Sequence, residues 1–331
     1  MIIITGGAGF IGANLVASLE KRGGEGLVVC DVFGQGAKWN NLAKRELRDI
    51  IAPDQLFPFL EAHRSQIKAI FHLGALSATT GADVDAIVQN NLRLSMDLLT
   101  WCGQQGVRFI YASSASTYGD GEAGFKDGFS REDLATLRPF HPYGWSKHMF
   151  DRAVAYLQDC QAGDYALPPQ YVGLKFFNVY GPNEYHKGSQ MSVIPQFYSQ
   201  IQQTGKVSLF KSDRPDYADG DQARDFVYVD DCVDVMLWLY DNPQVSGLYN
   251  VGTGKARTFA DLARAIFASL GQEAQITYRD LPEALKGQYQ YYTQADLANL
   301  RAAGYGRPFT SLEEGVKDYV QNFLMQSDPY R

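Results

Sequence analysis

Cysteine is scarce in this sequence, and the four that occur are far apart. Cys30, Cys102, Cys160 and Cys232 form no C-x-x-C pair and stand near no clustered histidines. Disulfide frameworks and structural zinc sites depend on recurring, closely spaced cysteines. We therefore expect reduced thiols, no metal site and a cytoplasmic protein.

An excess of basic residues and a long hydrophobic run are also missing. The formal net charge is −7 and the isoelectric point is near 5.3, which argues against a general surface for nucleic acid or anionic membrane. The apolar start, residues 1–6, is too short for the core of a signal peptide and lacks its basic region. No stretch approaches the length of a membrane span. The expected partners are small molecules, without nucleic acid and without a membrane.

The chain does contain a regular alternation of two hydrophobic patterns. Its 331 residues are 45% hydrophobic, enough for a large core. Short apolar runs typical of buried strands occupy residues 2–5, 27–30, 69–72, 109–112 and 173–176. Helical spacing separates them at residues 10–22, 86–101 and 148–157. This alternation predicts an α/β protein with a Rossmann-type doubly wound parallel sheet.

The pattern changes after about residue 177, where Gly, Pro and polar residues cluster between shorter elements. We predict a dinucleotide-binding domain over residues 1–177, with later segments near 225–252 returning to it. Residues 178–331 are expected to form mainly a smaller, interleaved α/β domain that binds the substrate.

A glycine-rich turn joins the first predicted strand to the first predicted helix. Gly6, Gly9 and Gly12 allow a tight turn and a close approach of a pyrophosphate to the helix N-terminus. Asp31 ends the next predicted strand, where an acid can bind the hydroxyls of an adenosine ribose. Asp31 alone favours NAD, whereas Lys38 could neutralise the 2′-phosphate of NADP, so these residues leave both cofactors open.

A serine, a tyrosine and a lysine form the candidate reaction centre. Tyr143 and Lys147 are four residues apart, so on a helix they share one face and the ammonium can favour the ionised phenol. Ser114 directly follows a predicted buried strand, at the sheet edge where ligands bind. These three residues predict hydride transfer, with Tyr143 as the base, Ser114 bonded to the reacting oxygen and Lys147 supporting both the tyrosine and the nicotinamide ribose.

In this order the motifs resemble the extended short-chain dehydrogenase/reductase family of nucleotide-sugar enzymes. The resemblance covers essentially the whole chain and includes residues 177–182 (FNVYGP), 224–229 (RDFVYV) and 249–252 (YNVG). It implies a homo-oligomer. It also assigns cofactor contacts to Phe10, Ile11, Leu73, Ala75, Ser77 and Asn90, and substrate contacts to Ser114, Asn178, Ser189, Gln196, Phe210, Arg224 and Tyr289. Arg224 suits a diphosphate because a guanidinium binds phosphate oxygens bidentately.

Within that family, four segments are similar to those of enzymes that invert C6″ of an ADP-linked heptose for lipopolysaccharide. These segments are residues 181–189 (GPNEYHKGS), 286–290 (KGQYQ), 293–297 (TQADL) and 300–305 (LRAAGY). The resemblance implies an ADP-heptose substrate, NADP more than NAD, and Lys187 as a second acid/base opposite Tyr143.

Three other functions stay open at this point. A UDP-hexose 4-epimerase would need only Ser114, Tyr143 and Lys147, and would leave Lys187 without a catalytic role. A 4,6-dehydratase typically uses an Asp-Glu pair where this chain has Ala115 and Ser116. A dinucleotide-sensing module without catalysis usually loses the tyrosine or the lysine, and this chain has both.

Overall fold

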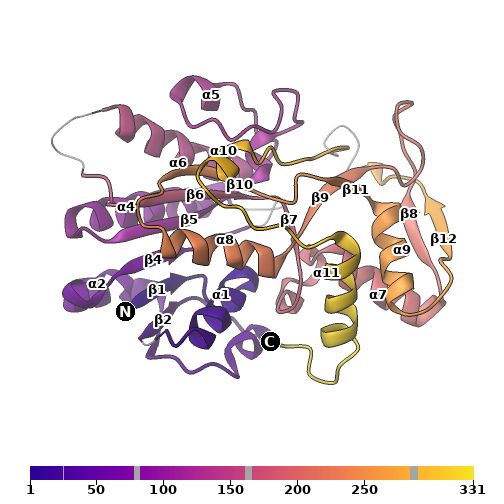
Figure 1. Cartoon of the computed structure of the whole chain (residues 1–331), viewed down its shortest axis with the longest axis horizontal. Helices are drawn as coiled ribbons and strands as arrows, with labels where there is room; N and C mark the ends of the chain where they lie inside the picture. Colours follow the sequence, from indigo (N-terminus) through magenta and orange to yellow (C-terminus); the bar gives the residue numbers. More distant parts are fainter. Residues whose placement is uncertain (25, 78–82, 161–165, 284–289) are drawn as a thin grey trace.

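The computed structural model describes residues 1–331 except 25, 78–82, 161–165 and 284–289. Within the described residues, seven parallel strands form one sheet in the order β10-β6-β5-β4-β1-β2-β3 (Figure 1). In chain order these strands are β1 (Ile2–Thr5), β2 (Leu27–Cys30), β3 (Asp49–Ile51), β4 (Ala69–His72), β5 (Arg108–Ser114), β6 (Tyr171–Phe176) and β10 (Gly247–Val251). The predicted Rossmann-type α/β fold is confirmed.

The central strands are apolar on both faces because helices cover both sides of the sheet. In β1, the side chains of Ile2 and Ile4 pack into one core, and that of Ile3 packs into the other. The first core includes residues of α1 (Phe10–Lys21) and α8 (Val229–Asp241). The opposite core includes residues of α2 (Leu56–His63), α4 (Leu94–Gln105) and α6 (Pro142–Asp159).

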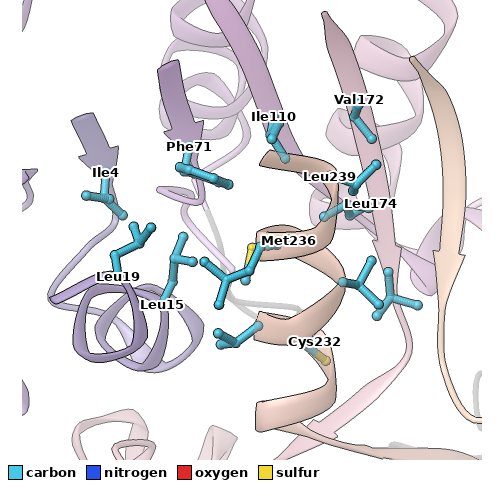
Figure 2. Packing of buried hydrophobic residues seen from close by; sticks show 14 of the residues in the cluster. Ile4, Leu15, Leu19, Phe71, Ile110, Val172, Leu174, Cys232, Met236 and Leu239 are labelled. Atoms are coloured by element: carbon cyan, nitrogen blue, oxygen red, sulfur yellow. The ribbon is translucent and has the colours of Figure 1, made fainter. Parts of the chain in front are cut away.

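Figure 2 shows how α1 and α8 close one face of the sheet. Leu15 and Leu19 of α1 and Met236 of α8 point toward strand residues such as Phe71 and Ile110, and all of these side chains are buried. Fully burying an aliphatic or aromatic side chain of this size stabilises a fold by about 1.5–3 kcal/mol. This packing fixes the position of α1, whose first turn faces the site described below.

The sheet reverses its strand order between β1 and β4. The chain runs from β1 outward through β2 and β3, then returns to add β4, β5 and β6 on the other side. In open α/β sheets, such a switch point leaves a crevice at the carboxyl ends of the strands, where ligands bind. The loops after β1, β4 and β5 meet there.

A second, smaller core lies beyond the carboxyl ends of the sheet, at the right of Figure 1. It contains residues of β7 (Asn178–Tyr180), α7 (Val193–Thr204), β8 (Val207–Phe210), β9 (Ala223–Tyr228), α9 (Phe259–Ser269), α11 (Leu312–Tyr319) and η8 (Val320–Leu324). Strand β9 pairs with β7 and with β11 (Ala256–Thr258), and β12 (Ile276–Arg279) pairs with β8. The domain division at residue 177, between β6 and β7, stays a prediction; β10 lies beside β6 in the main sheet.

Shorter elements connect these layers. They are η1 (Ala37–Leu42), α3 (Val84–Ile87), the π-helical turn η4 (Val88–Arg93), η5 (Ala115–Tyr118), α5 (Arg131–Ala135), η6 (Tyr185–Gln190) and α10 (Ala298–Ala302). None of the helices described is both long and apolar enough to cross a membrane.

Candidate active site

A cleft of about 950 Å³ opens at the switch point between β1 and β4. Most of the residues predicted for cofactor and chemistry line it together. They are Gly6, Gly9, Phe10, Ile11, Gly12, Asp31, Lys38, Leu73, Ala75, Ser77, Ser114, Tyr143, Lys147, Asn178, Lys187 and Ser189. The fold thus brings the glycine turn, the serine-tyrosine-lysine set and the Lys187 segment to one place.

The glycine turn is packed too closely for any side chain. A Cβ on Gly12 would lie 2.2 Å from the carbonyl oxygen of Gly6, and a Cβ on Gly6 would lie 2.5 Å from the backbone nitrogen of Gly74. Gly6 also has a φ of +68°, which L side chains rarely adopt. The following helix α1 has neither a side-chain cap nor an acidic residue in its first turn. Its N-terminus is therefore suited to an anion such as a pyrophosphate.

Asp31 and Lys38 form an ion pair beside this turn. Lys38 Nζ lies 2.5 Å from Asp31 Oδ1 and also donates to the carbonyl of Val32 at 2.8 Å. The other oxygen of Asp31 accepts a hydrogen bond from the backbone of Ala8 at 2.8 Å. The carboxylate thus braces the glycine turn, and the adjacent ammonium balances its charge.

Tyr143 and Lys147 lie on the first turns of α6, and Ser114 is the last residue of β5. Pro142 occupies the start of the helix, where its missing N–H costs no hydrogen bond. The ring of His141 caps the helix by accepting from the backbone of Gly144 at 3.1 Å. A Cβ on Gly144 would lie 2.8 Å from the carbonyl oxygen of Ser116, so this glycine lets α6 approach η5 closely.

Burial dominates the acid–base properties of this group. It lowers the pKa of Lys147 to about 8, while the nearby carboxylate of Asp151 acts in the opposite direction. Burial raises the pKa of Tyr143, and a hydrogen bond with Ser114 partly offsets that effect. Ser114 is therefore the neighbour that favours the ionised phenol, while Lys147 can release or hold a proton near neutral pH.

Lys187 enters the cleft from η6, a part of the chain remote in sequence from α6. Its Nζ lies 5.3 Å from the centre of the Phe10 ring, at the start of α1. Burial lowers its pKa, and Glu184 opposes this shift. The carboxylate of Glu184 is itself buried and accepts hydrogen bonds from Ser192 Oγ at 2.7 Å and Tyr319 at 3.2 Å.

Asn41 links this loop to the glycine turn, and the sequence analysis missed it. Its side chain is buried, and its Nδ2 lies 2.9 Å from the carbonyl oxygen of Ala8 and 3.0 Å from that of Asn183. The same nitrogen lies 3.2 Å from Nδ1 of His186, which lines the cleft. In the sequence, only its position three residues after Lys38 indicates that Asn41 could lie near the cofactor site.

Asn91, which follows the predicted cofactor residue Asn90, was not singled out from the sequence. It is fully buried in the π-helical turn η4, and its amide exchanges hydrogen bonds with the backbone of Leu76 at 2.8 and 3.0 Å. It also donates to Ser146 Oγ at 3.1 Å, and Ser146 Oγ donates to the carbonyl of Tyr143 at 2.8 Å. Asn91 thus joins the loop after β4 to the first turns of α6. A π-helical turn of this kind often occurs at functional sites.

Four of the predicted residues lie outside the residues that line the cleft. Asn90 is exposed and donates to the carbonyl of Ala86 at 2.8 Å. Gln196 donates to the carbonyl of Met191 at 3.0 Å. Arg279 covers the ring of Phe210 at 4.7 Å.

The fourth is Arg224. It is buried, with its guanidinium 5.7 Å from the ring of the cleft residue Phe259. Tyr289 lies outside the described residues. The contacts assigned to these residues stay predictions.

Comparisons with known proteins show what the chain is similar to. The ADP-L-glycero-D-manno-heptose-6-epimerase of Nitratidesulfovibrio vulgaris (strain Hildenborough) is 48% identical over 333 residues, covering 100% of both chains. The enzyme of the same name from Fusobacterium nucleatum is 44% identical over 338 residues, again covering 100% of both.

Among solved structures, the Helicobacter pylori ADP-L-glycero-D-manno-heptose-6-epimerase superposes with a TM-score of 0.79 at 29% identity, covering 97% of this chain and 95% of that one. Residues 2–252 match the model of the NAD dependent epimerase/dehydratase family. The chain is therefore a member of the NAD dependent epimerase/dehydratase family.

Proposed function

We propose that this protein is an ADP-L-glycero-D-manno-heptose 6-epimerase, which inverts C6″ of ADP-D-glycero-D-manno-heptose. Relatives of that name match the whole chain at 44–48% identity. The observation that carries the proposal is that Tyr143 and Lys187, two proton-transfer groups from distant elements, open into one cleft. Inversion through a planar ketone requires proton transfer on an oxygen that occupies two different positions in turn.

The proposed cofactor is a nicotinamide dinucleotide, with NADP favoured over NAD. The tight glycine turn and the open N-terminus of α1 fit a pyrophosphate. The ammonium of Lys38, which is paired with Asp31 beside this turn, supports NADP because it could neutralise a 2′-phosphate. When bound, the cofactor supplies the hydride acceptor and returns the same hydride.

The chain's own residues handle the proton. In one orientation of the sugar, Tyr143 accepts the proton of the C6″ hydroxyl while Ser114 donates a hydrogen bond to that oxygen. After the planar carbonyl turns over, Lys187 gives a proton to the oxygen that forms on the opposite side. The reverse direction exchanges the two roles. Burial lowers the pKa of Lys187, which makes its ammonium a better proton donor than that of an exposed lysine and its amine easier to form.

The same proposal assigns two residues of the cleft to substrate binding. Asn178 and Ser189 line it and are proposed to contact the sugar and its diphosphate. Cytoplasmic action and assembly into a homo-oligomer are further expectations for this enzyme.

Proton NMR tests the substrate and the reaction together. The purified protein is incubated with ADP-D-glycero-D-manno-heptose in deuterated water without added cofactor, and the C6″ signal is followed. The expected result is the L-glycero epimer with protium retained at C6″, because the hydride returns from the bound cofactor. The Tyr143→Phe variant should retain its fold and cofactor but lose inversion.

An untouched heptose would overturn the substrate assignment. In that case UDP- and GDP-linked hexoses are assayed in the same way. Turnover of a UDP-hexose at C4 would identify a 4-epimerase, in which Lys187 has no catalytic role. Deuterium at C6″ of the product would contradict direct hydride return.

A further inference from the structure

A buried ion pair lies directly behind the candidate reaction centre. Asp151 is on α6, four residues after Lys147, and Lys175 is on the neighbouring strand β6. Their side chains are both 0% exposed, and Lys175 Nζ lies 3.5 Å from Asp151 Oδ2. Neither residue lines the cleft, and neither has a role in the proton transfers proposed above.

The ion pair forms hydrogen bonds with residues before and after Ser114 in the chain. Ser113 Oγ donates to Asp151 Oδ2 at 2.7 Å, so the carboxylate holds the residue before Ser114. Lys175 Nζ donates to Thr117 Oγ1 at 2.7 Å, and Thr117 in turn donates to the carbonyl of Ser114 at 2.9 Å. The end of β5 is therefore fixed from both directions by one pair of charges.

Stability alone does not account for two buried charges. Moving each ion out of water is unfavourable, and well-packed apolar residues of the same volume often stabilise a fold as well or better. The carboxylate also accepts from the hydroxyl of Tyr111 at 3.1 Å, and Lys175 lies 4.5 Å from the centre of the Tyr118 ring. These contacts give both charged groups polar or aromatic partners, and they fix the pair one helical turn after Lys147.

We infer that Asp151 and Lys175 are positioning residues that keep Lys147 charged and hold Ser114 in line with Tyr143. This inference rests on the proposed function, since it concerns the same Ser114, Tyr143 and Lys147. Asp151 acts on Lys147 through its negative charge along one face of α6. Burial raises the pKa of Asp151, and the charge of Lys175 opposes that shift and so favours the ionised carboxylate.

Among the described residues, the following charged and titratable groups surround Lys147, Asp151 and Lys175. Lys147 is faced by Asp151 from its own helix and by His72 from β4. Asp151 is faced by Tyr111 and Ser113 from β5 and by Lys175 from β6. Lys175 is also influenced by Asp127, and it acts on His148 of α6. Burial lowers the pKa of Lys147 to about 8 against the influence of Asp151, so loss of this carboxylate lowers that pKa further.

The first experiment measures the titration of Lys147 without any substrate. Protein labelled with carbon-13 at the lysine ε position is titrated by NMR, and Lys147→Arg identifies the signal. In Asp151→Asn the midpoint of Lys147 is expected to fall by about one pH unit. Asp151→Glu should restore most of it. The control is Asp159→Asn, which removes an exposed carboxylate at the far end of the same helix.

The second measurement is the pH dependence of turnover. The alkaline limb of kcat is expected to move to lower pH in Asp151→Asn by the same amount as the Lys147 midpoint. A lower melting temperature with an unchanged Lys147 midpoint would overturn the inference and leave the pair a purely structural feature. The NMR result stands whatever the substrate, so it separates this inference from the proposed function.

If Asp151→Asn does not fold, a milder variant tests the inference. Thr117→Val keeps both charges but removes the hydroxyl that joins Lys175 to the Ser114 carbonyl. We expect kcat to fall several-fold with KM unchanged, and Thr117→Ser to restore it. Unchanged kcat in Thr117→Val would contradict the role of Lys175 in holding Ser114.

Discussion

Lys187 is the residue that separates the proposed two-base epimerase from a simpler enzyme on the same fold. It lines the cleft in η6, with a pKa lowered by burial. We expect Lys187→Met to lower the rate of C6″ inversion by about 10²–10⁴-fold, the usual contribution of general acid–base catalysis. NMR measures that rate, and fluorescence titration checks that the dinucleotide still binds.

The matched control is Lys206→Met, at an exposed lysine just before β8. It should leave inversion unchanged, because Lys206 is not among the residues lining the cleft. Full activity in Lys187→Met would mean that Tyr143 serves both orientations of the sugar, or that water replaces the lysine. The two-base scheme would then be wrong.

The sequence allowed us to predict the positions of site residues that follow a fixed local spacing. It did not allow us to predict those whose contacts come from distant parts of the chain. Tyr143 and Lys147 share a helix face, and Ser114 ends a strand, so short-range rules place them. Asn41 instead depends on carbonyls 33 and 142 residues away. No local pattern distinguishes it from a polar loop residue, since its contacts exist only after the chain has folded.

At the scale of the elements, the turn between β1 and α1 leaves no room for a side chain at Gly12. A Cβ on Gly12 would lie 2.2 Å from the Gly6 carbonyl oxygen, which forces the backbone of the turn to move. We expect Gly12→Ala to lower both the melting temperature and the affinity for the dinucleotide. Gly36→Ala is the control, because a Cβ there meets nothing within 4 Å. An unchanged affinity in Gly12→Ala would contradict the assignment of the turn to the pyrophosphate.

The contact between η1 and η6 couples the glycine turn to the Lys187 loop through Asn41. In Asn41→Ala the loop loses the hydrogen bonds to Asn183 and His186, and the turn loses the one to Ala8. We expect a loss of inversion by more than tenfold together with weaker dinucleotide binding. Removing a buried amide with several partners also destabilises the fold by about 1–3 kcal/mol.

Asn40→Ala is the control for this element. Asn40 is the adjacent residue, and its side-chain nitrogen lies 3.5 Å from the hydroxyl of Tyr330. It should change neither binding nor rate. If Asn41→Ala lowered stability but left both the affinity and the rate at the wild-type values, the coupling between the two elements would be refuted.

Element boundaries were predictable where burial on both faces determined them. The predicted strands at 2–5, 27–30 and 69–72 coincide with β1, β2 and β4. The helix predicted at 148–157 begins six residues earlier, at Pro142, because proline is favourable in a first turn. The helix predicted at 86–101 is divided by the π-helical turn η4, where Asn91 serves the neighbouring loop rather than the helix.

At the scale of the whole molecule, the alternation of strands and helices was enough to predict the main sheet. The second core was harder, because its strands are short and its partners come from separate segments. Strand β9, for example, lies between β7 and β11, and β8 pairs with β12, which follows it by more than 60 residues. Hydrophobic periodicity does not encode such pairings. The loop that carries Lys187 contacts this second core, because Tyr319 of α11 donates a hydrogen bond to Glu184 at 3.2 Å.

A buried histidine is expected to make the whole fold sensitive to acid. His148 is 4% exposed, and its Nδ1 has no hydrogen-bond partner among the described residues. Burial, together with the charges of Lys175, Arg152 and Arg138, lowers its pKa to about 4. The unfolded chain binds this proton near pH 6.5, so stability from His148 is present above pH 6.5 and is lost as the pH falls toward 4.

The test compares the free energy of unfolding of the native protein and of His148→Gln at pH 7.5, 6 and 5. Carboxyls with a raised pKa, such as Asp231 at about 6, act in the opposite direction and cancel in the difference between the two proteins. Between pH 7.5 and 5 that difference should shift by about 2 kcal/mol against the native protein, at about 1.4 kcal/mol per pH unit below 6.5. Equal slopes for both proteins would mean that His148 gains its proton in the folded state without opening the core between α6 and the sheet.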